Sequence, residues 1–204
     1  AVATDTLERA VLAALAEDIG AGDVTTEATV REDAVGTAEV LLKEPGVVCG
    51  VPVAAAVFQA LDPSVRVEAL VAEGAAATSP PVVVADIEGP ARAVLTGERV
   101  ALNLFARLCG IASLTRRFVE TAAASGGHAR IWDTRKTTPG LRALEKAAVR
   151  AGGGANHRGN LSDWVLLKDN HLARLSIEDA VAKSRQRWPA RTVHVECDHV
   201  SQVE

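Results

Sequence analysis

The sequence predicts an α/β protein, in which an N-terminal α+β region precedes a region of alternating strands and helices. Its 204 residues are 48% hydrophobic and 24% charged, which is typical of a folded chain of one large or two small domains. Apolar residues recur at helical spacing near the start, and short apolar runs alternate with helical segments after residue 130. The second pattern indicates βαβ units, a parallel sheet and an open or barrel-like winding.

The N-terminal region is expected to contain two helices and four strands. Leu7, Val11 and Leu15 recur every four positions, and Thr4 or Asp5 can cap the helix that they indicate. The turn at Pro45-Gly46 divides the first two strands. The predicted elements are a helix at 5–18, a loop at 20–26, two strands within 36–50, a helix at 51–61, and strands at 65–71 and 80–89.

A long helical segment is predicted at 92–124, where the sequence contains no proline. Glycine weakens a helix interior, so Gly110 is expected to divide the segment into two helices.

The region after residue 130 is expected to contribute three parallel strands. The predicted strands are 130–135, 164–168 and 192–198, with helices at 140–150 and 177–188. Three strands cannot close a barrel, and their sheet would keep two open edges. The sequence therefore predicts either a fragment or a sheet that is completed by a partner.

Several classes of protein are disfavoured by composition. The net charge of −4 argues against general nucleic-acid binding, which needs a basic surface. The three cysteines, Cys49, Cys109 and Cys197, form no CxxC pair, so we expect buried reduced thiols rather than a zinc site or disulfides. No apolar run reaches membrane-spanning length, and the N-terminus lacks the pattern of a signal peptide. We therefore expect a cytoplasmic protein.

Polar side chains follow each predicted strand of the parallel sheet, where α/β proteins bind ligands. Between residues 130 and 171 the sequence has eight Lys or Arg and two His against four acidic residues. Arg135 and Arg158 can each bind a carboxylate or a phosphate through two parallel hydrogen bonds, and the lysines add point charges. The glycines let the backbone approach a ligand, and Glu196 and Asp198 could hold Mg²⁺. The sequence therefore predicts a polyanionic ligand. The candidates are Asp133, Thr134, Arg135, Lys136, Gly152–Gly154, His157, Arg158, Lys168, Asp169, Asn170, His171, Glu196 and Asp198.

Each feature also has a purely structural interpretation. Arg135 and Lys136 could pair with Asp133 or Glu145. Lys168 follows three apolar residues, and burying its amine is costly unless an anion meets it, although it could also extend from a sheet edge to water.

The segment between the first two parallel strands has its own structural alternatives. Arg142, Lys146 and Arg150 are spaced like the solvated face of a helix. His157 could be structural, and the triple glycine could mark only a flexible loop.

The stretch "DTRKTTPGLRALEKAAVRAGGGANHRGNLSDWVLLKDNH" at 133–171 resembles the signature region of the quinolinate phosphoribosyltransferase family. "EDIGAGDVTT", "EPGVVCG", "GERVALNLFARLCGIAS" and "VHVECD" extend the resemblance over essentially the whole chain. The resemblance implies transfer of phosphoribosyl from phosphoribosyl pyrophosphate to quinolinate, with release of pyrophosphate and CO₂, in NAD biosynthesis. It also implies Mg²⁺ as a cofactor and a homodimer.

By this resemblance, residues 1–104 form an N-terminal α/β sandwich with a linking helix, and residues 105–204 form an open, here incomplete, parallel α/β barrel. The resemblance places four residues around the quinolinate carboxylates: Arg135, His157, Arg158 and Lys168. It places Lys136 on the phosphoribosyl pyrophosphate, Thr134 at a substrate contact, Glu196 on the ribose or Mg²⁺, and Arg99 in the partner subunit's site. Lys136, Lys168 and Glu196 are the expected catalytic residues. These groups are expected to converge in one pocket.

Two alternatives remain at this point. Lys168 could instead be a Schiff-base lysine of a barrel lyase, which would need neighbouring cations to lower its pKa. A truncated chain could also retain only anion binding and dimerisation. In addition, Gly159-Asn160 departs from the family pattern after "NHR" and could alter the loop that carries Arg158.

Overall fold

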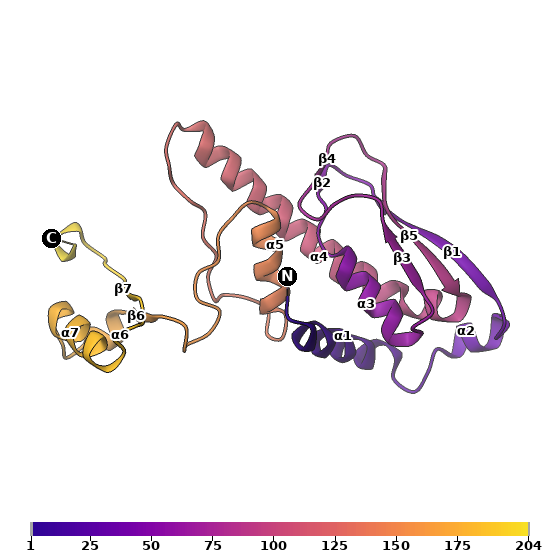
Figure 1. Ribbon diagram of the computed structural model, residues 1–204, viewed down its shortest axis with the longest axis horizontal. Coiled ribbons are helices and arrows are strands. Elements are labelled where there is room, and N and C mark those ends of the chain that lie inside the picture. Colours follow the sequence, from indigo (N-terminus) through magenta and orange to yellow (C-terminus); the bar gives the residue numbers. More distant parts are fainter. Residues whose placement is uncertain (1, 204) are drawn as a thin grey trace. The chain divides into compact units, whose positions relative to one another are not determined.

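The computed structural model describes residues 2–203 and contains both helices and short sheets (Figure 1). The chain divides into two compact units, one that ends at His157 and one that begins at Arg158. The predicted domains, 1–104 and 105–204, stay a prediction.

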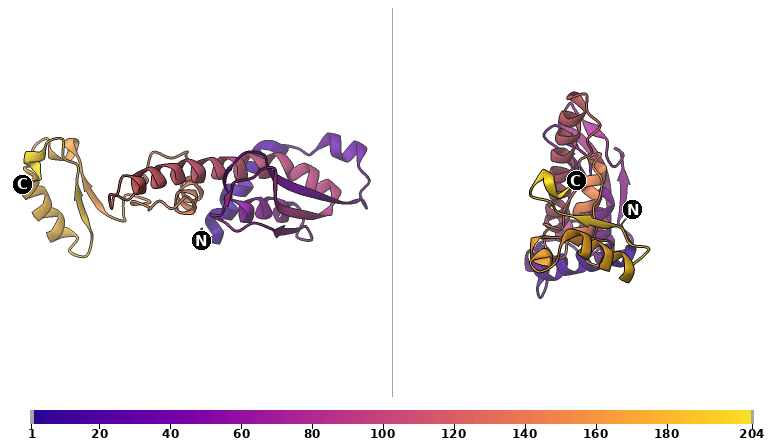
Figure 2. Two further views of the ribbon diagram at one scale, coloured as in Figure 1. Left: turned by 90° about the horizontal axis from the view of Figure 1, so that it is seen from above. Right: turned by 90° about the vertical axis from the view of Figure 1, so that its left-hand side faces the viewer.

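The first unit is an antiparallel sheet covered by helices. Strand β5 lies between β1 and β3, while β2 pairs with β4 in a second small sheet. Helices α3 and α4 pack together and against the larger sheet (Figure 2), with Val57, Val84 and Leu104 in the shared core. The elements are α1 (Thr4–Ile19), α2 (Val24–Thr29), β1 (Val35–Leu42), β2 (Gly46–Val47), α3 (Val51–Leu61), β3 (Arg66–Ala69), β4 (Ala76–Ala77), β5 (Val82–Pro90), α4 (Ala91–Ala124) and α5 (Arg142–Ala151).

The first two predicted helices are confirmed, and α3 has the predicted bounds. Neither predicted cap of α1 is used, because Ala3 is its N-cap residue and makes no side-chain hydrogen bond. The predicted loop at 20–26 is partly wrong, because α2 begins inside it. Asp23 caps this short helix by accepting a hydrogen bond from the backbone N–H of Thr26, at 3.0 Å.

Helix α4 is continuous, so the predicted division at Gly110 is wrong. Leu108, Cys109 and Ala112 on either side of the glycine are buried in the core. Burial of this helix face outweighs the roughly 1 kcal/mol that a glycine costs a helix.

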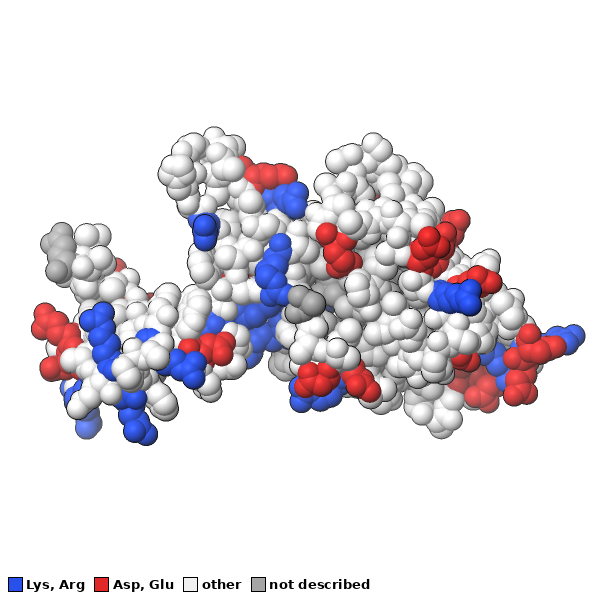
Figure 3. All heavy atoms as spheres, in the orientation of Figure 1, with Lys and Arg blue, Asp and Glu red and all other residues white. Residues whose placement is uncertain are grey.

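The second unit contains a two-stranded parallel sheet. Strands β6 and β7 pair in register from Val165 opposite Val193 to Leu167 opposite Val195, which confirms two of the predicted strands at reduced length. The unit comprises β6 (Val165–Leu167), α6 (Asp169–Leu172), α7 (Ile177–Arg187), β7 (Val193–Val195) and a 3₁₀ turn (Val200–Gln202). Figure 3 shows Lys and Arg side chains over α7, as expected for a largely exposed helix.

The predicted strand at 130–135 is wrong in extent. It forms only an isolated parallel bridge, between Trp132 and Ala155, and both residues belong to the first unit. No ladder of backbone hydrogen bonds extends from this bridge, so a third parallel strand is not formed within residues 2–203.

None of the helices described for residues 2–203 combines the length and the apolar character that crossing a membrane requires.

Candidate anion-binding site

The bridge brings together the two segments of the first unit that carry predicted site residues. The backbone N–H of Asp133 donates to the carbonyl of Ala155 at 3.0 Å, and the N–H of Ala155 donates to the carbonyl of Ile131 at 2.8 Å. Arg135 follows the first segment, and His157 ends the second. Two backbone hydrogen bonds alone would fix these segments weakly.

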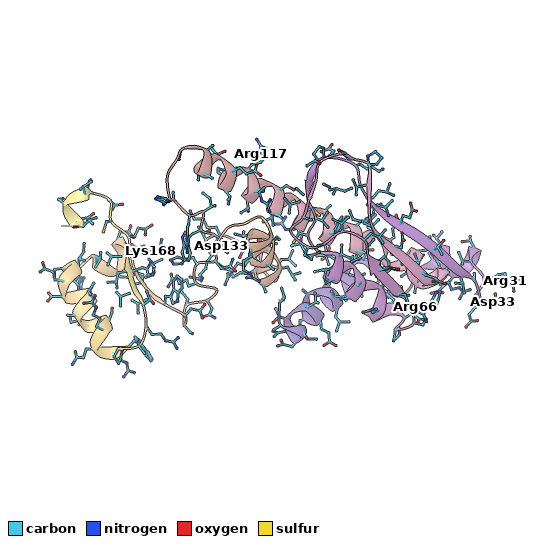
Figure 4. The ribbon with its side chains drawn as sticks, turned by 45° about the horizontal axis from the view of Figure 1, so that its top comes forward. Arg31, Asp33, Arg66, Arg117, Asp133 and Lys168 are labelled. Atoms are coloured by element: carbon cyan, nitrogen blue, oxygen red, sulfur yellow. The ribbon has the colours of Figure 1, made fainter. Side chains whose placement is uncertain are left out.

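A buried ion pair reinforces the bridge. The side chains of Asp133 and Lys146 are 7% and 8% exposed and contact each other directly. The Asp133 carboxylate also accepts from the backbone N–H of His157 at 2.8 Å and from the Asn156 amide. The Lys146 ammonium donates to the His157 carbonyl at 3.0 Å. Figure 4 shows Asp133 beside α5, the helix that supplies Lys146.

The solvated-face interpretation of α5 is therefore wrong for Lys146, which is 6% exposed. Arg142 and Arg150 are better described by it, although each also holds a neighbouring polar side chain. Arg142 donates to the Thr137 hydroxyl at 2.9 Å, and Arg150 donates to the Asn156 side chain. These contacts fasten the loops at both ends of α5.

A second buried carboxylate holds the loop between Arg135 and α5. Glu145 accepts from the Arg107 guanidinium, with an Nε–Oε1 distance of 2.8 Å, and from the backbone N–H of Thr138 at 3.2 Å. Burial raises the pKa of the Glu145 carboxyl, but the Arg107 and Thr138 hydrogen bonds outweigh it, so the pKa lies below its ordinary value. Glu145 is therefore a permanently charged anchor at neutral pH.

Both acids that could neutralise Arg135 are thus already paired with other cations. The Arg135 Nε is buried, and no group among the described residues accepts a hydrogen bond from it. The interpretation that Arg135 pairs with Asp133 or Glu145 is wrong, because Lys146 and Arg107 occupy those carboxylates. A buried donor without an acceptor is costly, and an anionic ligand would supply the acceptor.

The three consecutive glycines serve packing. A Cβ at Gly152 would lie 2.4 Å from the Ala112 carbonyl oxygen and 2.6 Å from the Thr115 Cβ, so only glycine lets this loop touch α4. Gly153 has a φ of +93°, which favours glycine. Arg116 of α4 donates to the Gly152 carbonyl at 3.1 Å. The interpretation as a merely flexible loop is not supported.

In the second unit, Lys168 is paired with Glu196. Their Nζ–Oε2 distance is 2.8 Å, and their side chains are 42% and 51% exposed. The premise of a buried amine is wrong, because Lys168 lies at the end of β6, beyond its apolar residues (Figure 4). The Schiff-base alternative requires cations beside the Lys168 amine, whereas the group paired with this amine is the Glu196 carboxylate.

Arg158 lies at the start of the same unit and donates to the Trp164 carbonyl at 3.3 Å. The Asp163 carboxylate accepts from the N–H groups of Gly159 and Asn160, at 2.7 and 3.3 Å. Gly159-Asn160 therefore forms a closed turn that follows Arg158 directly.

The remaining predicted residues are accessible. Arg99 on α4, Thr134 and Lys136 are exposed, and the Thr134 hydroxyl accepts from the backbone N–H of Lys136 at 3.1 Å. His157 is half-buried, with its ring edge-on to Trp132. Convergence of the groups of the two units in one pocket stays a prediction.

The residues that the structure describes do not by themselves build a metal site. Within residues 2–203, no group of three or more His, Cys, Asp or Glu side chains is placed to hold a metal ion. Glu196, the predicted ligand, already neutralises Lys168. A magnesium ion would need most of its oxygen ligands from elsewhere, such as substrate phosphates and water.

The helices and sheets described above form an α/β fold, and the buried polar cluster beside Arg135 is its candidate anion-binding site. The family model "Quinolinate phosphoribosyl transferase, N-terminal domain" matches residues 23–109, and the C-terminal domain model matches residues 111–204. The chain belongs to the quinolinate phosphoribosyltransferase family.

Relatives and solved structures agree with this assignment. A probable nicotinate-nucleotide pyrophosphorylase [carboxylating] of Synechocystis sp. is 47% identical, over 93% of this chain and 64% of its own length. The Mycobacterium leprae enzyme is 43% identical, over 99% and 70%. NadC from Streptococcus pyogenes has a TM-score of 0.91 at 39% identity, over 99% of this chain and 71% of that one. The predicted fold class is confirmed.

The chain thus spans about two thirds of the length of these relatives, and 58% of the length of the Bacillus subtilis relative.

Proposed function

We propose that this chain binds quinolinate and phosphoribosyl pyrophosphate and contributes to the decarboxylating phosphoribosyl transfer between them. The observation that carries the proposal is Arg135, a half-buried cation whose Nε has no hydrogen-bond acceptor among the described residues, while Asp133 and Glu145 are already paired. A planar guanidinium matches a carboxylate through two parallel hydrogen bonds. Quinolinate, a pyridine with two adjacent carboxylates, supplies such an acceptor.

The other cations divide between the two substrates. His157, whose backbone the Asp133 carboxylate holds, and Arg158 would meet the quinolinate carboxylates with Arg135. Lys136 is exposed on the same loop as Arg135 and would meet the phosphate groups. Lys168 and Glu196 form a pair that can open toward a substrate, because both side chains are about half exposed.

In the proposed reaction the pyridine nitrogen attacks C1 of the ribose, and the bond from C1 to pyrophosphate breaks with its electron pair on oxygen. The bond between the ring carbon and the carboxylate next to the nitrogen then breaks and releases CO₂. Its electron pair stays on the ring carbon, which takes up a proton from water. No protein nucleophile is required. The chain would contribute orientation and positive charge near the leaving pyrophosphate.

Mg²⁺ stays part of the proposal as an ion brought with the pyrophosphate group. When bound, it would neutralise charge on the leaving oxygens. Glu196 is the residue of this chain that we propose as its protein ligand.

The proposed assembly is a homodimer in which Arg99 serves the partner's site. Support comes from the exposure of Arg99 on α4, where no acid among the described residues pairs with it. Mixing Arg99→Ala chains with Lys168→Ala chains should restore activity, because one site of the mixed dimer keeps both residues. Recovery no greater than the two variants show alone would contradict action across the dimer. We also propose a cytoplasmic location, which suits the free cysteines.

Calorimetric titration with quinolinate tests the proposal directly. Arg135→Ala should weaken binding by about 1.5–3 kcal/mol, as expected for hydrogen bonds to a charged group. Arg117→Ala, an exposed arginine of α4, is the matched control and should bind like the wild-type chain (Figure 4). Unchanged affinity in Arg135→Ala would remove Arg135 from the site. Binding of quinolinate without turnover when phosphoribosyl pyrophosphate is added would favour a fragment that only binds anions.

A further inference from the structure

Lys146 is a buried cation that the proposed reaction does not use. Its side chain is 8% exposed, and its ammonium contacts Asp133 while donating to the His157 carbonyl at 3.0 Å. The ammonium is thus committed to protein acceptors and cannot serve as a direct substrate contact in this arrangement.

The partners of Lys146 lie on two different segments. Asp133 begins the segment that continues to Arg135 and Lys136, and His157 ends the segment that follows the glycines. The Asp133 carboxylate bridges them as well, because its Oδ1 accepts from the His157 N–H at 2.8 Å while also facing the ammonium. Asn156 completes the cluster by donating to Asp133 and, at 2.9 Å, to the Lys146 carbonyl.

We propose that Lys146 is a positioning residue, which sets the distance between the segment that carries Arg135 and the segment that ends at His157. This inference rests on the proposed function, since it takes these two residues as groups that bind one anion. The isolated bridge between Trp132 and Ala155 is too short to hold the segments by backbone pairing alone. The ion pair therefore supplies the constraint that a longer parallel strand would otherwise give.

The accuracy of this spacing matters because a dicarboxylate needs two cationic groups at a fixed separation. A misplacement of about 1 Å can cost about 100-fold in a reaction that depends on orientation. Without Lys146, the Asp133 carboxylate would be buried without its cation, and it would move toward water and carry both segments with it.

The test compares Lys146→Met with Leu144→Ala in calorimetric titrations of the whole chain with quinolinate. Leu144 lies on the same helix, is 1% exposed and belongs to the hydrophobic core, so its truncation destabilises the fold without touching the cluster. A variant that is only less stable loses titratable sites but keeps the dissociation constant. We expect Leu144→Ala to behave in this way, and Lys146→Met to raise the dissociation constant at least ten-fold with the number of sites retained.

Hydrogen exchange gives a second measurement that needs no substrate. In Lys146→Met, the backbone amides of residues 131–136 and 154–158 should exchange faster than in the wild-type chain, while those of α3 stay protected. If Lys146→Met does not fold, Lys146→Arg, which keeps the cation, takes its place with the same expectations, because its larger planar guanidinium would overpack the buried space that the ammonium occupies and push the two segments apart.

The two measurements separate the two proposals. A wild-type chain that does not bind quinolinate would overturn the proposed function, while hydrogen exchange would still decide the role of Lys146. A folded Lys146→Met chain with wild-type exchange in both segments, or with an unchanged dissociation constant, would overturn the positioning role.

Discussion

Replacing Gly152 by alanine should destabilise the chain, although alanine normally suits its backbone. Gly152 has φ −73° and ψ −6°, so the substitution introduces no backbone strain. Its added Cβ, however, would lie 2.4 Å from the Ala112 carbonyl oxygen and 2.6 Å from the Thr115 Cβ. The first separation must grow by at least about 0.6 Å, because real Cβ contacts essentially never fall below 3.0 Å.

The expected magnitude is the difference between two opposing effects. Overpacking a well-packed contact costs about 1–3 kcal/mol. Alanine also lowers the conformational entropy of the unfolded chain, which raises the free energy of unfolding by about 0.4–1 kcal/mol. We expect the free energy of unfolding of Gly152→Ala to fall by about 1–2 kcal/mol, and the loop that leads to His157 to shift away from α4.

Gly110→Ala is the matched control, since nothing lies within 4 Å of its added Cβ and the residue is inside a helix. Its free energy of unfolding should rise by about 0.5–1 kcal/mol. Urea unfolding followed by circular dichroism measures both variants. If Gly152→Ala were stabilised as much as Gly110→Ala, the close packing of the glycine loop on α4 would be refuted.

Two further predictions concern ionisable groups. Because the folded-state pKa of Glu145 lies below its ordinary value of 4.5, the carboxylate adds stability above about pH 4.5, and this stability is lost as the pH falls through the folded-state pKa. Urea unfolding of Glu145→Gln from pH 7 to pH 3 should show a weaker loss of stability with acid, and an unchanged slope would contradict the anchoring role of Glu145. Burial raises the pKa of the Cys49 thiol to about 12 and that of Cys109 to about 11. A thiol reagent at pH 8 should therefore modify Cys197 first and reach the other two only on unfolding, so that rapid labelling of three thiols in the folded chain would refute their burial.

Periodic apolar patterns predicted the longer helices and most strands, because those elements are held by burial of one face, whereas the short helices α2 and α6 were not predicted. Helix α3 was predicted with its observed bounds, and β6 and β7 were found within a few residues. The division at Gly110 was wrong because propensity is a local quantity, whereas the flanking residues are fixed by contacts with the rest of the core. A very short strand such as β4 carries too few residues to show a period.

The site was predicted as a set of residue types, and its internal pairing was not. The motif places Arg135 and Asp133 two residues apart, which suggests an ion pair between neighbours. In the structure, Asp133 instead pairs with Lys146, thirteen residues away, and Glu145 pairs with Arg107 of α4, thirty-eight residues away. The spacing of residues on α5 could not predict these pairs, because a lysine beside alanines is expected to be exposed unless the acid that pairs with it is known. These long-range pairs satisfy both buried acids and leave Arg135 with a buried donor that no described residue satisfies. An anionic substrate would supply the acceptor that the buried Arg135 Nε lacks among the described residues.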